Sequence, residues 1–326
     1  MFRKADVEAR LRSKPFEPAM RNAHLQTMFG TAFRRPPPLP ATLEHWSTED
    51  DDFLRVHLWP SEEAGPLVLM LHGLEGSIQS PYLVGQARVL HALGYTVVVM
   101  EHRSCGGPLN RARRLYHSGE TSDLNFVVQR LVARYPTRPI LIYGVSLGGN
   151  QVAKWLGTHP IPDAVRGAVV ISPPFDLTIS GPHMDRRGLA YVQYFLRTLI
   201  PKALAKERQY PGCMDADAVR SSKTFEAFDT HATAALHGFE DAMDYYRKSS
   251  CGQFLSDIRT PTLLIAAHDD PFNPGRTIPH GIVDSSSSLI GLFPRRGGHV
   301  GFVADSVLQP RYWLETVTTQ FYEAVR

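Results

Sequence analysis

The chain is poor in cysteine and has no long apolar run. Only three cysteines occur among its 326 residues, and they are Cys105, Cys213 and Cys251. They are far apart and form no C-x-x-C pair, which argues against a disulfide framework and favours a reducing compartment. No apolar stretch approaches the roughly 18 residues of a membrane-spanning helix, and the N-terminus lacks the apolar core of a signal peptide. We therefore expect a cytoplasmic protein with no integral membrane association.

An excess of one charge is missing as well. Lys and Arg number 35 against 32 Asp and Glu, so the formal net charge is +3. This balance predicts no nucleic-acid partner, although a pI of about 8.7 is compatible with mild attraction to anionic surfaces. The sequence contains no H-E-x-x-H pattern and no Gly-Lys-Ser/Thr phosphate loop, so we expect neither a metal nor a cofactor.

The chain does contain an alternation of strand and helix patterns. Apolar strand patterns cover residues 42–46, 53–59, 66–73, 95–102, 140–145 and 165–172, and helical patterns cover 81–94, 121–136 and 150–160. Such alternation predicts crossover units on a mainly parallel sheet with helices on both faces.

The alternation stops between Pro173 and Arg259. That part shows only helical patterns, such as 187–200, 223–228 and 239–248; strand patterns return at 260–270 and 287–293, and a helix is predicted from about Ser306 to Val325. We interpret 173–259 as a helical cap inserted in an α/β core formed by 41–172 and 260–326, with residues 1–40 packing on that core. The aromatic residues of the cap either line an acyl pocket or simply pack between its helices.

One turn between strand and helix carries a catalytic motif. The residues Gly144-Val145-Ser146-Leu147-Gly148 fit G-x-S-x-G, the nucleophile elbow, in which a serine stands on a tight turn above the sheet. Gly144 and Gly148 would remove Cβ atoms where strand and helix cross closely. The alternative is a glycine-rich turn with a serine that plays no part in chemistry.

A serine needs a base, and the base needs a carboxylate that orients it. In this motif's fold the chain order is serine, acid, histidine. Asp269 and Asp270 follow the apolar strand residues Thr262 to Ala267, and His299 lies in a glycine-rich loop further on. We predict Ser146, Asp270 and His299 as the catalytic set. Asp270 is preferred because it precedes Pro271, which favours an extended backbone, and the neighbouring side chain of Asp269 then points the other way.

Two backbone N–H groups should form the oxyanion hole. One is expected from Leu147, the residue after the nucleophile. The other is expected from the loop 71–77, where Leu74 is the best candidate and a neighbouring residue is the alternative.

Several further motifs carry a family resemblance that extends over nearly the whole chain. They are "NAHLQT", "HGLEGSIQSPY", "EHRSCGG", "YHSGETSDL", "GVSLGGN", "DDPFNP" and "GGHVGF". Together they resemble the YheT-like hydrolases, family four of the AB hydrolase superfamily. The resemblance implies the α/β-hydrolase fold and carboxylic-ester hydrolysis by Ser146, Asp270 and His299, with a small-molecule ester or acyl lipid as the expected substrate. The alternative is a non-catalytic ligand-binding or regulatory protein on the same fold, which a fluorophosphonate probe for an activated serine would distinguish.

Overall fold

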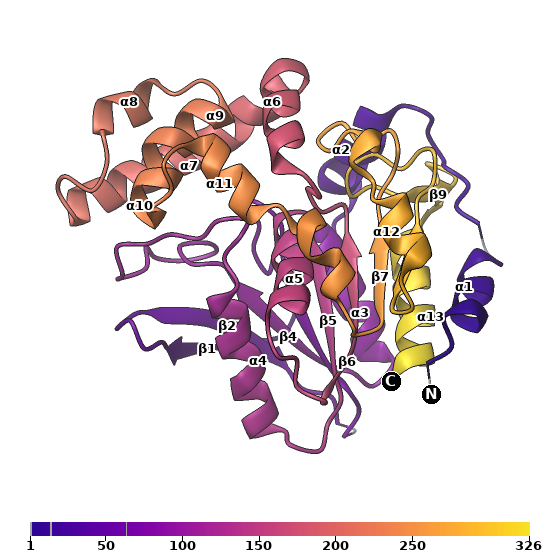
Figure 1. Cartoon of the computed structure of the whole chain (residues 1–326). Helices are drawn as coiled ribbons and strands as arrows, with labels where there is room; N and C mark the ends of the chain where they lie inside the picture. The colour runs from indigo at the N-terminus through magenta and orange to yellow at the C-terminus, as the bar shows by residue number, and fades with distance from the viewer. Residues whose placement is uncertain (1, 14, 63) are drawn as a thin grey trace.

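The computed structural model describes residues 2–13, 15–62 and 64–326, and it is built around one large twisted sheet (Figure 1). The strands are β1 Thr42–Ser47, β2 Phe53–Trp59, β3 Leu67–Leu71, β4 Thr96–Glu101, β5 Ile140–Val145, β6 Val165–Ile171, β7 Thr262–Ile265 and β8 Leu289–Leu292. Their order across the sheet is β1-β2-β4-β3-β5-β6-β7-β8. The strands β4, β3 and β5 to β8 run parallel to one another, whereas β2 is antiparallel to both of its neighbours, β1 and β4.

Helices cover both faces of this sheet. The helices of the core are α1 Lys4–Arg12, α2 Ala23–Phe33, α3 Pro81–Ala92, α4 Ser122–Arg134, α5 Leu147–Thr158, α12 His280–Ser285 and α13 Trp313–Val325. Successive side chains of a strand point to opposite faces, so Leu67, Leu69 and Leu71 pack with α4 and α5 while Val68 and Met70 pack with α3 and α13. The predicted mainly parallel sheet between two helical layers is thus confirmed.

The connection between β6 and β7 is long and contains only helices and loops. Its elements are α6 Leu177–Arg187, α7 Leu189–Gln209, α8 Ala216–Ser221, α9 Phe225–Phe228, the π-helix η1 Asp229–Ala234, α10 Ala235–His237, α11 Ala242–Ser249 and the 3₁₀ helix η2 Cys251–Asp257. We call Leu177–Ser249 the helical insertion. It has an apolar cluster of its own, in which Val192, Leu196 and Phe228 are buried, and it lies over one end of the sheet (Figure 1).

Two predicted helices have other bounds in the structure. The helix expected from about Ser306 begins only at Trp313, because Val303–Asp305 and Pro310–Tyr312 form an antiparallel pair, β9 and β10. Pro310 cannot donate a helical hydrogen bond, and Asp305 has a φ of 67°. The helix expected at 187–200 is α7, which starts at Leu189 and continues through Pro201 to Gln209.

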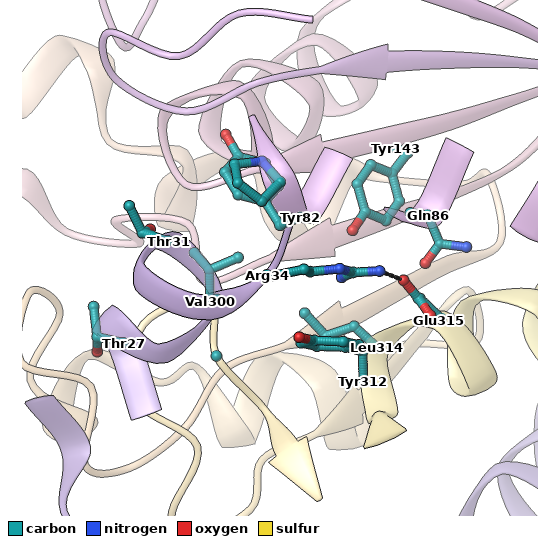
Figure 2. A pocket seen from close by; sticks show the side chains of 13 residues that line it. Thr27, Thr31, Arg34, Tyr82, Gln86, Tyr143, Val300, Tyr312, Leu314 and Glu315 are labelled. Atoms are coloured by element: carbon teal, nitrogen blue, oxygen red, sulfur yellow. Dashed lines mark hydrogen bonds and ion pairs between the residues drawn. The ribbon is translucent and has the colours of Figure 1, made fainter. Parts of the chain in front are cut away.

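The N-terminal segment is bound to the core by side chains. Val7 of α1 is buried in the same apolar cluster as α13. Beyond α2, Arg34 forms an ion pair with Glu315 of α13, and its guanidinium lies 3.7 Å from the ring centroid of Tyr312. Figure 2 shows these side chains around a small cavity of about 40 Å³. The short 3₁₀ turn η3 Gly275–Thr277 completes the set of elements.

Candidate active site

Ser146 stands on a strained turn between β5 and α5. Its φ of 55° is unusual for a residue other than glycine, and its backbone N–H donates to the Ile171 carbonyl at 2.7 Å. A Cβ on Gly144 would lie 2.7 Å from the Gly148 carbonyl oxygen, and a Cβ on Gly148 would lie 2.5 Å from the His72 carbonyl oxygen. Both distances are too short for real atoms, so the two glycines allow the close crossing that raises the serine above the sheet.

The structure brings the three side chains of the predicted set together. Ser146 Oγ lies 2.8 Å from His299 Nε2, and His299 Nδ1 lies 2.8 Å from Asp270 Oδ2. Both His299 and Asp270 are buried. The imidazole tautomer with its proton on Nδ1 donates to Asp270 and leaves Nε2 free to accept from the serine hydroxyl.

The neighbouring carboxylate, Asp269, faces elsewhere. Its Oδ1 accepts the Gly298 N–H at 3.0 Å, and burial raises its pKa. Asp270 uses its second oxygen, Oδ1, to accept the backbone N–H groups of Phe272 at 2.7 Å and Asn273 at 3.2 Å. These bonds fix the orientation of the Asp270 carboxylate, while Asp269 holds the backbone of the histidine loop.

Two backbone N–H groups beside Ser146 have no acceptor among the described residues: those of Leu147 and Leu74. On either side of Leu74 the N–H groups are occupied, because Gly73 donates to the Tyr82 hydroxyl at 2.9 Å and Glu75 donates to the Tyr116 hydroxyl at 2.9 Å. Between Gly73 and Ser77, Leu74 is therefore the residue whose N–H has no acceptor among the described residues. A Cβ on Gly73 would lie 3.2 Å from the Ser146 Cβ, so the loop passes directly over the nucleophile.

A clamp formed by three side chains holds this loop, and sequence reasoning did not identify it. Glu75 has a φ of 54°. Its carboxylate oxygen Oε1 accepts the Tyr116 hydroxyl at 2.7 Å and the ammonium of Lys202 at 2.5 Å. Lys202 belongs to α7, so the clamp also connects the loop to the helical insertion. The motif "HGLEGS" contained Glu75, but nothing in the sequence indicated its partners.

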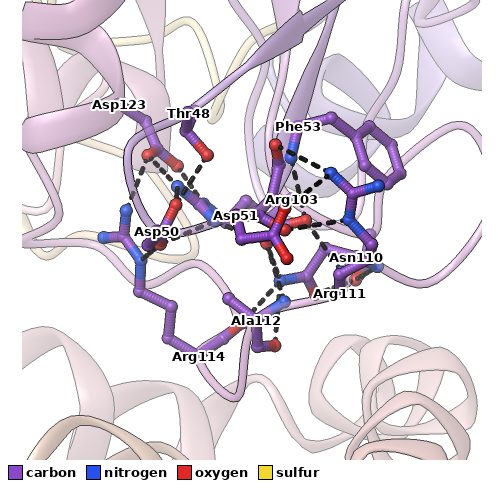
Figure 3. Close-up of polar contacts among 12 residues, drawn as sticks. Thr48, Asp50, Asp51, Phe53, Arg103, Asn110, Arg111, Ala112, Arg114 and Asp123 are labelled. Atoms are coloured by element: carbon purple, nitrogen blue, oxygen red, sulfur yellow. Dashed lines mark hydrogen bonds and ion pairs between the residues drawn. The ribbon is translucent and has the colours of Figure 1, made fainter.

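The segment that carries Tyr116 rests on a buried ionic network (Figure 3). Arg103, which is 2% exposed, donates to Asp52 at 2.5 Å and to both carboxylate oxygens of Asp123 at 2.8 and 2.7 Å. Asp52 also accepts the Asn110 amide at 2.6 Å. The network joins the β1–β2 loop, the segment after β4 and the start of α4, and thereby fixes the route of residues 103–116.

The loop of His299 is held by the N-terminal segment. Thr27 of α2 accepts the His299 N–H through its hydroxyl at 3.0 Å. Gln26, which is fully buried, donates to the Val303 carbonyl at 3.0 Å and accepts the Val303 N–H at 2.8 Å. Asn22 caps α2 by accepting the Leu25 N–H at 3.0 Å. These contacts give the motif "NAHLQT" a role in positioning the histidine.

A cavity of about 1020 Å³ opens above the three side chains. Its floor includes Ser146, Leu147, Leu74 and His299, and its other walls come from α2 and from the helical insertion. Phe272 stacks on the His299 ring with centroids 4.2 Å apart, which shields one face of the imidazole. Within residues 2–13, 15–62 and 64–326 there is no group of three or more His, Cys, Asp or Glu side chains that could hold a metal ion.

Comparison with known proteins identifies the family of this chain. The family model described as the alpha/beta hydrolase fold matches residues 66–281. The chain belongs to the α/β-hydrolase family. Within this family it is similar to the Escherichia coli protein named "Putative esterase YheT", with 36% identity over 90% of this chain and 88% of the relative.

Two other relatives have names that describe lipid hydrolysis. Phospholipase ABHD3 of Mus musculus is 28% identical over 80% of this chain and 64% of its own length. Monoacylglycerol lipase of Saccharomyces cerevisiae is 27% identical over 75% of this chain and 56% of its own length. The matches thus span less than two thirds of these two enzymes. A solved esterase structure from Pyrococcus furiosus, 16% identical, covers 90% of this chain and 99% of its own with a TM-score of 0.60, in agreement with the predicted fold.

No helix of the described residues is both long and apolar enough to cross a membrane.

Proposed function

We propose that this α/β-hydrolase is a serine esterase that cleaves carboxylic esters through an acyl-enzyme. The proposal rests on one observation: two consecutive hydrogen-bond distances of 2.8 Å connect Ser146 Oγ, the His299 imidazole and the Asp270 carboxylate. Leu74 and Leu147, whose N–H groups are open, line the same cavity as Ser146. Nucleophile, base, orienting acid and oxyanion donors are the complete set that acyl transfer requires.

The reaction proceeds in two halves. His299 Nε2 takes the proton of Ser146 as Oγ attacks the ester carbonyl, and the N–H groups of Leu74 and Leu147 stabilise the oxyanion. The tetrahedral intermediate collapses when the alkoxide leaves with the proton from His299, and the acyl group remains on Ser146. Water then attacks the acyl-enzyme, again deprotonated by His299, and the carboxylic acid and free Ser146 are released. Asp270 stabilises the imidazolium and holds its tautomer throughout.

The cavity and the relatives support an ester with an acyl chain or lipid as substrate. A volume of about 1020 Å³ is at the upper end of the range for ligand pockets and accommodates an extended chain. The enzymes named phospholipase and monoacylglycerol lipase among the relatives act on lipid esters. Oligomeric state plays no part in the proposal.

The test combines labelling with turnover. A fluorophosphonate probe should label the wild-type protein, and a panel of p-nitrophenyl esters of graded chain length should be hydrolysed. Ser146→Ala should lose labelling and lower kcat by about 10⁴ to 10⁶, with its fold intact by circular dichroism. Labelling of neither protein would support the non-catalytic alternative and overturn the proposal.

We propose further that residues 173–259 act as a cap that sets the preferred chain length. Met184 of α6 is 4% exposed and lines the cavity. Met184→Phe should therefore shorten the usable cavity and move the optimum of the ester panel to shorter chains, while labelling of Ser146 is retained. An unchanged optimum in the folded variant would show that this part of the insertion does not determine specificity.

A further inference from the structure

Exposed apolar side chains occur on two helices that line the cavity, α2 and α7. Met28 of α2 and Tyr194 of α7 line the cavity, yet they are 45% and 62% exposed. They therefore stand at its mouth. Three further large apolar residues of the same two helices are exposed: Leu25 at 59%, Phe33 at 72% and Leu189 at 50%. We call these five residues the apolar collar.

The two helices of the collar are in direct contact. His24 Nδ1 of α2 lies 3.0 Å from the Tyr191 hydroxyl of α7, and their rings stack with centroids 5.8 Å apart. On α2, the collar residues Leu25, Met28 and Phe33 lie within one face at helical spacing. An exposed apolar cluster of this kind commonly marks a surface that contacts a membrane or a partner.

Acidic residues are scarce on the two helices of the collar: α2 has none, and α7 has Glu207 near its C-terminal end. No Asp or Glu occurs at positions 18–43 or 186–206, the stretches that contain α2 and most of α7. Five arginines of these stretches make no ion pair with any described residue: Arg21, Arg35, Arg186, Arg187 and Arg197. An apolar centre with unpaired arginines beside it matches a bilayer interface, where apolar side chains enter the acyl boundary and cations meet anionic headgroups.

We propose that the apolar collar and its arginines dock on an anionic lipid bilayer, with the mouth of the cavity turned towards the acyl chains. This inference rests on the proposed function in one respect: docking provides a route by which a lipid ester, the proposed substrate, enters the cavity above Ser146. The bilayer is favoured over a second copy of this chain because the collar would meet a like-charged surface in a symmetric pair. Docking of this kind is peripheral and reversible, and it needs no membrane-spanning helix.

The test measures vesicle binding with Ser146→Ala in the full chain, so that the result does not depend on turnover. Co-sedimentation is compared between vesicles of phosphatidylcholine alone and vesicles with about one third phosphatidylglycerol. We expect binding mainly to the anionic vesicles, and a strong decrease in 0.5 M salt, because screening weakens the attraction between exposed charges. Equal binding to both vesicle types, or no binding to either, would overturn the proposal.

Paired variants locate the surface. Arg187→Gln with Arg197→Gln should weaken binding about fivefold per charge, hence roughly 25-fold. Leu25→Asp with Leu189→Asp should weaken it at least as much. The matched controls are Leu93→Asp and Arg166→Gln. Leu93 is 45% exposed between α3 and β4, and Arg166 is exposed near the start of β6. Both therefore lie at the N-terminal ends of the parallel strands, whereas Ser146 follows the C-terminal end of β5.

The controls should bind vesicles like the parent protein, and all variants should keep the circular dichroism spectrum of the parent. If the controls weaken binding as much as the collar variants, binding is unspecific and the assignment is wrong. Sedimentation velocity tests whether the collar instead binds a second copy of the chain. If the parent protein is a dimer that the collar variants dissociate, and it does not bind vesicles, the collar is a dimer interface and the proposal is wrong. Fluorophosphonate labelling of the wild type is a separate readout, so failure of the esterase proposal and failure of docking remain distinguishable.

Discussion

The hydroxyl of Tyr116 offers a direct test of how the oxyanion loop is held. It accepts the Glu75 N–H at 2.9 Å and donates to the Glu75 carboxylate at 2.7 Å. Tyr116→Phe removes both bonds and preserves the ring, which stacks on His102 with centroids 5.1 Å apart. The Glu75 N–H is then left without its acceptor, next to the open N–H of Leu74.

The expected magnitude follows from the two lost bonds. A buried donor left unpaired costs about 1 to 3 kcal/mol, and the loop can avoid that cost by turning the Glu75 N–H towards water. Such a turn moves the adjacent Leu74 N–H away from the oxyanion. If the aligned loop is disfavoured by about 2 kcal/mol, kcat falls roughly 30-fold. KM should change little, because the oxyanion develops only in the transition state.

The assay is steady-state turnover of a p-nitrophenyl ester, together with the rate of fluorophosphonate labelling. Tyr322→Phe is the matched control, since its buried hydroxyl donates to the Ile142 carbonyl at 2.7 Å, away from the loop. The control should lose about 1 kcal/mol of stability and keep its turnover. A Tyr116→Phe protein whose kcat stays within twofold of the wild type would refute the clamp as a determinant of the oxyanion hole.

Two other predictions concern carboxylates. Asp270→Asn should lower kcat by about 10⁴, because the correct histidine tautomer is lost. Asp269→Asn disturbs only a backbone contact and should lower kcat by about tenfold. Steady-state kinetics on the two folded variants tests this, and a larger loss in the Asp269 variant would exchange the roles of the two carboxylates. Burial alone raises the pKa of Glu101, but hydrogen bonds from His57 and Arg55 outweigh it and lower the pKa to about 2. The ionised Glu101 carboxylate therefore stabilises the fold above pH 4.5, and this stabilisation is lost as the pH falls towards 2. In urea unfolding, Glu101→Gln should be up to about 3 kcal/mol less stable than the wild type at pH 7, and its stability should depend less on pH in acid. If the stability of the variant falls in acid in parallel with that of the wild type, Glu101 is not the group responsible.

The fold could be predicted because its signals are local. Buried parallel strands such as β3 and β5 are short runs of Leu, Ile and Val, and each is followed by a helix with a regular apolar face. The ends of helices were harder to predict where tertiary contacts override the helix propensity of individual residues. Pro201 lies inside α7, which continues because Leu196, Leu199 and Ala203 of the same helix are buried.

The predicted site residues were those with a recognisable position in the chain. Ser146 stands in a five-residue motif, and Asp270 and His299 follow it in a fixed order, so their meeting in space required only the fold. The loop donor was uncertain by one residue because sequence does not show which N–H groups are already bonded. Tyr82 and Tyr116, which are 9 and 41 positions away from their donors, accept the N–H groups of Gly73 and Glu75, and the Leu74 N–H between them has no acceptor among the described residues.

The supporting residues could not be predicted because each acts through a contact between remote segments. Thr27 and His299 are 272 positions apart, and Glu75 and Lys202 are 127 positions apart. Such a pair has no periodicity and no motif of its own. Their placement nevertheless bears on the proposed mechanism: the N-terminal segment contacts the loop of His299, the proposed base, and the helical insertion contacts the loop of Leu74, the proposed oxyanion donor. The same two segments line the cavity, so we expect a displacement of either segment to alter both access to the cavity and the alignment of the proposed site.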